Sequence, residues 1–378
     1  MTGFDPVAAA DAYLQRLPAA ALAAAPAQTA WAEALGVATV IVVVLACWAV
    51  ARSGLLVRLR ERLEVSRRPR WIADAVCGAV LAGLVALACS PLALVAAARD
   101  GSGTALPALV MSLRQAVLFA VAGAIFAPLL YGLMRLSARG WSLIGGAALA
   151  ALVFALAWLP FASASGPAAL PIAPAGPARA GLLRLISDTG LPAREVYVSA
   201  NPAIDADVTG AGAARVVVSR GLWTQGSPAE IRASIGHLMG HYAHRDQLSI
   251  AVLLAVLTLG LFMALGSLFP LAARLVGASG VKSVADPAGA PALMALAAVY
   301  LACAVTLDHG FIRWINVRAD QYSLDQAREP DGLAAALLHE WRGEAPNPSA
   351  IQQALFYDHP SLQSRLLHAM RWKAAHPS

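Results

Sequence analysis

Six long apolar stretches constrain the fold of this chain more than any other feature of its sequence. Each is near or above the length that a helix needs to cross the hydrocarbon core of a bilayer, about 20 residues. They cover approximately residues 34–52, 72–98, 115–134, 143–161, 248–270 and 290–308. Buried helices of a water-soluble protein do not explain them, because the four stretches in the first half are separated mainly by short loops. The sequence therefore predicts a polytopic α-helical membrane protein.

The composition of the chain agrees with membrane insertion. Of 378 residues, 59% are hydrophobic and 13% are charged, and the mean hydropathy is +0.64. The four cysteines all lie inside predicted spans, where they are expected to act as small apolar residues rather than as disulfide partners or zinc thiolates. No nucleic-acid-binding signature accompanies the net charge of +6, which comes largely from one loop. We expect membrane lipid, and no nucleic acid, among the partners.

That basic loop predicts the orientation of the chain. Residues 52–70 contain seven arginines and two glutamates. The positive-inside rule places such a short loop in the cytoplasm. Alternation then places residues 163–246 and the C-terminal tail on the opposite side. Because the Ala- and Arg-rich composition suggests a bacterial inner membrane protein, the soluble face is predicted to be periplasmic.

Two histidines stand four residues apart after the fourth span. Ser227 as N-cap, Pro228 at the first position and Glu230 as the end of a capping box predict a helix from Pro228 to about Asp246. On that helix His237 and His241 lie one above the other, an arrangement that lets two imidazoles hold one zinc ion. A chance pair of histidines on an amphipathic helix is the alternative.

The elements before this helix form a small mixed region. A Pro-rich link at Pro167–Pro177 precedes a helix at Arg179–Asp188. Strands are predicted at Glu195–Ser199 and Arg215–Ser219, with the turn at Gly210–Gly212 between them. Strand, strand and helix with a histidine pair is the layout of a zincin core, although two short strands before a helix are common in any α/β region.

These features divide the chain into five parts. We expect an N-terminal amphipathic arm at 1–30, spans one to four at 31–162, a zincin-like domain at 163–246 with its motif helix at 228–246, spans five and six at 247–309, and a C-terminal helical completion of that domain at 310–378.

Further motifs point to a family. They are Arg67-Arg-Pro-Arg-Trp-Ile-Ala-Asp74, Leu159-Pro160, Ile235-Gly-His-Leu-Met-Gly-His-Tyr242, Ala319-Asp320, Glu329-Pro-Asp-Gly332, Phe356-Tyr-Asp-His-Pro360 with Arg365, and Met370-Arg-Trp-Lys373. With them the chain resembles the membrane-embedded zinc metalloendopeptidases of the CAAX prenyl protease type, metallopeptidase family 48. Its signature His-Glu-x-x-His stands here as His-Leu-Met-Gly-His, with Leu238 in place of the Glu.

The resemblance implies roles for individual residues. The zinc ligands of the family are the two motif histidines and a Glu four residues before the Asp of the Ala-Asp pair, a position that Asn316 occupies here. Asp320 is then expected to orient a motif histidine as a second-shell partner. His359 and Arg365 match residues that lie near the active site as polar stabilisers of the reacting carbonyl. From the sequence alone, a helix-entry turn at His359 and a surface charge at Arg365 are equally good readings.

Two hypotheses about function follow. Leu238 cannot act as the general base, whose assistance is typically worth about 10²- to 10⁴-fold in rate. Asn316 supplies no carboxylate to a metal that usually has three protein ligands, and Arg318 adds positive charge nearby. The first hypothesis is a pseudoprotease that binds membrane proteins or peptides, with doubtful zinc occupancy. The alternative is an active zinc endopeptidase that cleaves membrane or periplasmic proteins, with Asp320 or His309 recruited as a ligand.

Overall fold

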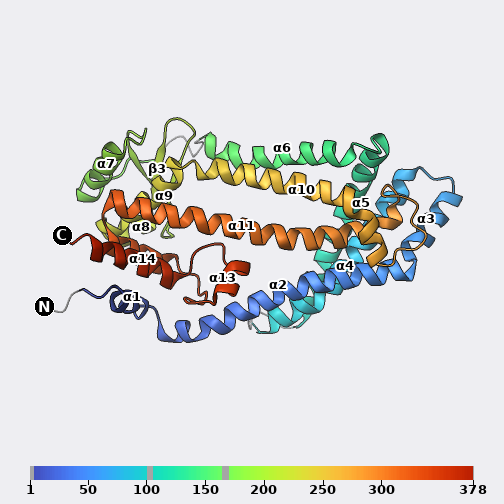
Figure 1. Ribbon diagram of the computed structural model, residues 1–378, viewed down its shortest axis with the longest axis horizontal. Coiled ribbons are helices and arrows are strands. Elements are labelled where there is room, and N and C mark those ends of the chain that lie inside the picture. Colours follow the sequence, from blue (N-terminus) through green and yellow to red (C-terminus); the bar gives the residue numbers. More distant parts are fainter. Residues whose placement is uncertain (1–3, 100–104, 164–169, 378) are drawn as a thin grey trace. The chain divides into compact units, whose positions relative to one another are not determined.

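The computed structural model describes residues 4–99, 105–163 and 170–377, which are mainly helical (Figure 1). The first three residues of the predicted N-terminal arm and residues 167–169 of the Pro-rich link lie outside the described residues. The chain forms two compact units. Unit 1 comprises Met1–Trp31, Val153–Leu254 and Thr306–Ser378, and unit 2 comprises Ala32–Leu152 and Ala255–Val305.

In the described part of the chain, six helices are long and apolar enough to cross a membrane. They are α2 (Ala19–Ser53), α4 (Arg70–Arg99), α5 (Ala105–Leu136), α6 (Trp141–Ala162), α10 (Asp246–Leu275) and α11 (Ala290–Ala327). Each contains one of the predicted apolar stretches, so the prediction of six spans is confirmed. The helices extend beyond those stretches because the flanking residues, apolar or polar, continue the same backbone hydrogen bonding.

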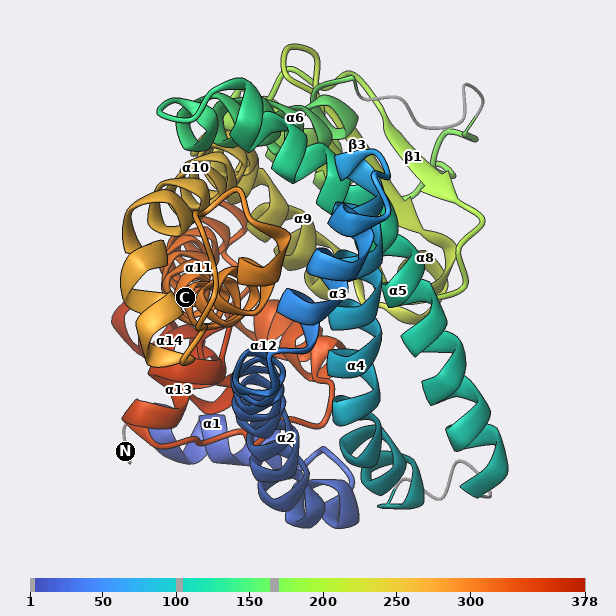
Figure 2. The same cartoon turned by 90° about the vertical axis from the view of Figure 1, so that its right-hand side faces the viewer.

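Small residues bring two spans of unit 2 close together. Helices α4 and α5 run side by side (Figure 2). Gly78 of α4 faces Gly123 of α5, and a Cβ atom built on Gly78 would lie 2.5 Å from the Cβ atom of Ala127. The absence of side chains at this crossing therefore permits an approach that larger residues would prevent.

Two ion pairs with buried carboxylates connect neighbouring elements of unit 2. Arg60 of α3 (Leu55–Val65) donates a hydrogen bond to Asp286, which caps the short 3-10 helix η1 (Pro287–Gly289). Arg135 of α5 donates to both oxygens of Asp74 in α4, over 2.7 and 2.6 Å. Both pairs lie within unit 2.

Unit 1 contains a three-stranded sheet with the order β1-β3-β2. Strand β1 (Val196–Ser199) is parallel to β3 (Arg215–Ser219), and β2 (Ala206–Thr209) is antiparallel to β3. Sequence analysis missed β2, because it has only four residues and includes an aspartate, a residue type depleted in strands. The turn at Gly210–Gly212, where Gly210 has φ 115°, therefore joins β2 to β3 rather than linking the two predicted strands directly.

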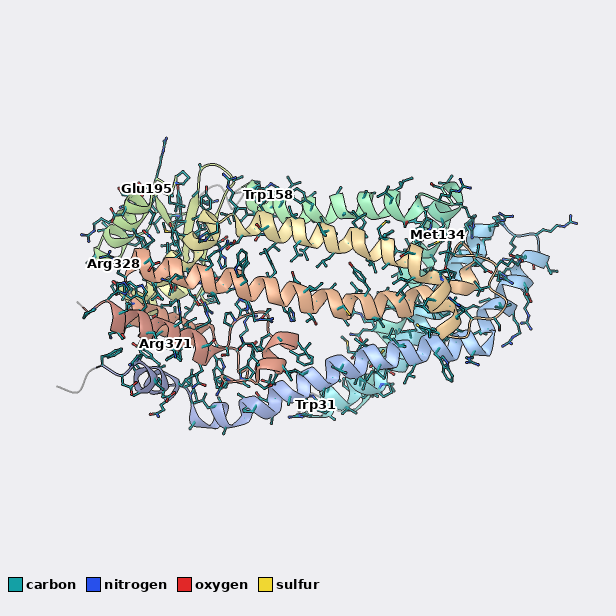
Figure 3. All side chains as sticks on the ribbon, viewed as in Figure 1. Trp31, Met134, Trp158, Glu195, Arg328 and Arg371 are labelled. Atoms are coloured by element: carbon teal, nitrogen blue, oxygen red, sulfur yellow. The ribbon has the colours of Figure 1, made fainter. Side chains whose placement is uncertain are left out.

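Two helices pack against this sheet. The described helix α7 (Pro177–Thr189) contains the predicted segment Arg179–Asp188, and it shares an apolar core with the sheet and with α9 (Pro228–Ala243). The short helix α8 (Arg220–Gln225) links β3 to α9. An ion pair of 2.7 Å joins Arg179 of α7 to Glu195, the residue before β1. Glu195 is labelled in Figure 3.

The remaining helices of unit 1 share a second core. It combines α9 and α11 with α12 (Pro330–Glu340), α14 (Leu362–Ala375) and α1 (Pro6–Leu14), and α13 (Ala350–Phe356) precedes α14 in the chain. In α1, Tyr13 is buried and donates a hydrogen bond of 2.8 Å to Asp331 of α12. Part of the predicted N-terminal arm is therefore a packed helix of unit 1.

Candidate metal centre

The two motif histidines converge on one point. The Nε2 atoms of His237 and His241 lie 3.1 Å apart, and the two rings are nearly perpendicular, at 86°. They share one face of α9 because they stand four residues apart, and the helix begins after its N-cap Ser227, whose hydroxyl accepts the N–H of Glu230. Two nitrogens bound tetrahedrally to zinc would be separated by about 3.3 Å. The imidazole pair thus has the geometry of half a zinc site.

Asp320 of α11 holds the first of these histidines. Its Oδ1 atom lies 2.8 Å from Nδ1 of His237. The same carboxylate accepts two hydrogen bonds from Arg365 of α14, each of 2.7 Å, and is buried. In metal sites such a carboxylate orients the ring of a ligand histidine and sets its tautomer.

Asp246 holds the second histidine in the same way. Helix α9 ends at Ala243 rather than at Asp246, the chain turns through Arg245 at φ 55°, and Asp246 begins α10. This break places Oδ2 of Asp246 2.9 Å from Nδ1 of His241, and its other oxygen accepts a hydrogen bond from Arg318. Sequence reasoning missed Asp246, although a carboxylate at the first residue of a membrane span is a signal for a functional or paired acid.

Leu238 and Asn316 stand at the two positions where the resemblance predicts a base and a third ligand, and neither side chain carries a carboxylate. Leu238 is partly buried and packs against the apolar core around the sheet. Asn316 is also buried, one turn before Asp320, and its Nδ2 atom donates a hydrogen bond of 2.9 Å to the carbonyl of Ile312 in its own helix. Within the described residues, no three His, Cys, Asp or Glu side chains are grouped so as to hold a metal ion. The site therefore does not fit the three-ligand set of a catalytic zinc.

Comparison with known proteins identifies the family. The family model described as peptidase family M48 matches residues 176–373, more than half of the chain. The chain belongs to peptidase family M48. Among solved structures, the M48 protein is similar to the crystal structure of S. mikatae Ste24p, with 17% identity, a TM-score of 0.50, and coverage of 77% of this chain and 74% of that chain. At this identity the likeness concerns the fold. No curated protein sequence matches the chain.

These findings confirm the resemblance to membrane-embedded M48 peptidases and the predicted fold class. The M48 protein is an integral membrane protein, because six apolar helices accompany a Ste24p-like fold. The family consists of metallopeptidases. The chemistry of this member depends on the residues around its histidine pair.

Candidates for a replacement ligand in the M48 protein are already engaged or lie elsewhere. Both oxygens of Asp320 accept hydrogen bonds from Arg365, and Oδ1 also contacts His237. The carboxylate of Asp246 is divided between His241 and Arg318. His309 has a buried Nδ1 atom without a hydrogen-bond partner, and it belongs to no potential metal-ligand group in the described residues.

The two retained polar candidates occupy different environments. His359 is half-exposed, before α14, and its Nδ1 atom lies 2.9 Å from the carboxylate of the neighbouring Asp358. Arg365 is buried against Asp320 and reaches Glu340 at 3.5 Å. Burial opposes its charge, but Asp320 outweighs this effect and raises the pKa of the Arg365 guanidinium. Arg365 therefore contacts the histidine pair through Asp320, whereas no hydrogen bond joins His359 to the pair in the described part of the chain.

Burial also shapes the charge state of the histidines. It lowers the pKa of His241, an effect that repulsion from His237 reinforces and that the hydrogen bond to Asp246 only partly opposes. His241 is therefore neutral at pH 7, the state in which an imidazole can bind a metal.

Proposed function

We propose that this M48 protein is a pseudoprotease that binds peptides or segments of membrane proteins without hydrolysing them. One observation carries the proposal: the carboxylates that contact the histidine pair, Asp320 and Asp246, are each paired with an arginine. The two positions from which the family supplies a base and a third ligand hold Leu238 and Asn316.

Peptide hydrolysis requires a group that takes a proton from the attacking water. Leu238 has no titratable atom, and its side chain packs against the core of the sheet. Asp320 and Asp246 are each hydrogen-bonded to an arginine and to a motif histidine, so neither carboxylate is a free base beside the histidine pair. Loss of the general base alone is expected to reduce the rate by about 10²- to 10⁴-fold.

Peptide binding needs none of the missing carboxylates. In the described part of the chain the sheet order is β1-β3-β2, and strand β2 pairs there with β3 alone. An edge strand of this kind can bind an extended peptide by main-chain hydrogen bonds. This is the feature that supports a binding role after hydrolysis is lost.

The alternative is an active zinc endopeptidase with a recruited ligand, and metal content together with cleavage tests it. We would purify the full chain in detergent and measure zinc per chain by elemental analysis, beside a His237→Ala, His241→Ala double variant. The same preparations would be titrated with fluorescently labelled unfolded casein, followed by anisotropy for binding and by mass spectrometry for cleavage.

We expect sub-stoichiometric zinc and casein binding without products. Stoichiometric zinc that disappears in the double variant, together with cleavage products that a chelator abolishes, would overturn the proposal in favour of the active enzyme. An absence of casein binding in every preparation would leave the hydrolytic argument intact but would refute the binding role.

The cellular setting that we propose is a bacterial inner membrane, with the histidine pair on the periplasmic side. The arginine-rich segment at 52–70 supports this orientation by the positive-inside rule. The clients in this setting would be membrane proteins or periplasmic peptides, and membrane lipid would surround the spans.

A further inference from the structure

A charged cavity lies in unit 2, away from the histidine pair in the sequence. It has a volume of about 290 Å³ and is lined by α3, the first turns of α4, and the segment before α11. Helix α3, which is labelled in Figure 1, contacts both α4 and η1. Five basic and three acidic side chains contribute to its lining.

Two of the acidic groups are already neutralised by buried or half-buried arginines. Asp74 accepts a hydrogen bond from each terminal nitrogen of Arg135, and Asp286 forms an ion pair with Arg60. Asp74 and Asp286 are both nearly fully buried. In each pair one positive charge offsets one negative charge, so these two pairs add no net charge to the cavity.

The remaining charges leave an excess of cations. Lys282 contacts Glu64 at 3.4 Å, but both side chains are at least half exposed, so water weakens their attraction. Arg68 and Arg70 have no acidic partner in the described part of the chain. These two guanidinium groups are therefore available to an anion.

Residues that line the cavity also carry further hydrogen-bond donors. The guanidinium of Arg60, a side chain that is only 3% exposed, pairs with Asp286 and Glu61 through its terminal nitrogens. Its Nε atom has no hydrogen-bond partner among the described residues and lies 3.9 Å from a carboxylate oxygen of Glu64. The cavity is also lined by Arg70 and Ala73, which belong to the first turn of the 30-residue helix α4. The N–H groups of a first helical turn are unpaired within the helix and attract negative charge.

A tryptophan places the cavity at the level of the lipid headgroups. Trp71 follows Arg70 at the start of α4 and is 59% exposed. Tryptophan side chains gather at membrane interfaces, where their amphipathic rings lie among the headgroups. A ligand of this cavity would therefore be a lipid headgroup rather than an acyl chain.

We propose that this cavity binds the phosphodiester group of an anionic phospholipid, through Arg68, Arg70 and the free Nε–H of Arg60. Guanidinium groups suit phosphate because they donate parallel hydrogen bonds to two of its oxygens. The ion pair with Asp286 holds Arg60 in place, and Arg68 and Arg70 supply the positive charge that attracts the phosphate.

Lipid titration by native mass spectrometry tests the proposal. The full chain in dodecyl maltoside would be titrated with phosphatidylglycerol and, separately, with phosphatidylcholine. An Arg68→Gln, Arg70→Gln variant removes the unpartnered cations. An Arg58→Gln, Arg62→Gln variant of helix α3 is the matched control, because it removes the same charge from the same basic segment without touching the cavity lining.

We expect phosphatidylglycerol to bind the wild type and the control alike, and the cavity variant roughly 30-fold more weakly. Phosphatidylcholine should bind none of them selectively.

Equal weakening in both variants would overturn the proposal, because it would reveal a diffuse attraction to the basic surface. In a third arm, displacement of the lipid by millimolar inorganic phosphate would assign the site to free phosphate and would equally overturn the lipid proposal. Unchanged thermal unfolding midpoints of both variants verify that they are folded.

Discussion

His237 and His241 approach each other through Nε2 atoms 3.1 Å apart, while the Nδ1 atom of each ring contacts a different buried carboxylate. Because each Nδ1 faces a carboxylate oxygen, we assign its hydrogen to that position. Two neutral rings would then present lone pairs to each other. This arrangement suits a metal ion that both Nε2 atoms can bind. The pair therefore offers two nitrogen ligands, and among the described residues no third His, Cys, Asp or Glu side chain is grouped with them to hold a metal ion.

Restoring the two lost carboxylates should recover metal binding and hydrolysis in separate steps. We expect Asn316→Glu alone to raise zinc to about one per chain, because it supplies the third ligand of a catalytic site. Adding Leu238→Glu should then increase peptide cleavage by about 10²- to 10⁴-fold over the single variant. Elemental analysis and mass spectrometry of casein digests measure the two effects. Cleavage by the unmodified chain at the rate of the double variant would show that the native side chains already suffice.

Acidic pH should destabilise the fold through His241. Its pKa is lowered by burial, so the folded state binds this proton less readily than the unfolded state, whose pKa is about 6.5. The contribution of His241 to the unfolding free energy should therefore decrease as the pH falls below about 6.5 and reach its minimum below the folded pKa. Tryptophan fluorescence melting between pH 5 and 8 would follow this loss. A His241→Gln variant should show a shallower pH dependence, and an unchanged profile would contradict the prediction.

Removing Arg365 should destabilise unit 1, because Asp320 would remain as an uncompensated buried charge. We expect Arg365→Leu to lower the unfolding free energy by about 3–5 kcal/mol, the typical cost of breaking a buried pair. Arg371→Leu is the matched control, since Arg371 lies on the same helix α14, is exposed, and is labelled in Figure 3. Equal melting temperatures for the two variants would show that Arg365 contributes little to folding and would favour a role at the peptide site.

The crossing of α4 and α5 should tolerate no added side chain. A Cβ atom at Gly78 would clash with the carbonyl oxygen of Gly123, so we expect Gly78→Ala to cost about 1–3 kcal/mol of unfolding free energy. Gly36→Ala is the control, because nothing lies within 4 Å of a Cβ atom built on Gly36 of α2. The control should be neutral or slightly stabilising, as alanine favours helix. Similar melting points for both variants would show that the spans can shift apart without cost.

Reporter fusions test the proposed orientation. Alkaline phosphatase folds to its active, disulfide-bonded form only outside the cytoplasm. We expect an active fusion after Ala375, at the end of α14, and an inactive fusion within the basic segment at Arg67. The positive-inside rule is the physical basis of this expectation. The reverse pattern would place the histidine pair in the cytoplasm.

The helical architecture could be predicted because it is encoded locally. A bilayer offers the backbone no hydrogen-bond partners, so an apolar stretch such as residues 72–98 has to form a helix whatever its neighbours do. Ser227 and Pro228 likewise specify the start of α9 from adjacent residues. Strand β2 escaped prediction because its stability comes from pairing with β3, which its own four residues do not encode.

The candidate site likewise combines features that follow from the sequence with features that only the tertiary structure determines. The sequence determines the spacing of His237 and His241 on one helix. It also led to the prediction, from the resemblance to the family, that Leu238 and Asn316 stand where the family has carboxylates. Only the tertiary structure decided what surrounds them. It brings Asp246 to His241 across a helix break, and Asp320 to His237 from a different helix, and it pairs each carboxylate with Arg318 or Arg365. Hydrogen bonds act over about 3 Å, whereas Asp320 stands more than eighty residues from His237 in the chain. Linear spacing determines the contacts within one helix, and the packing of separate elements determines the rest.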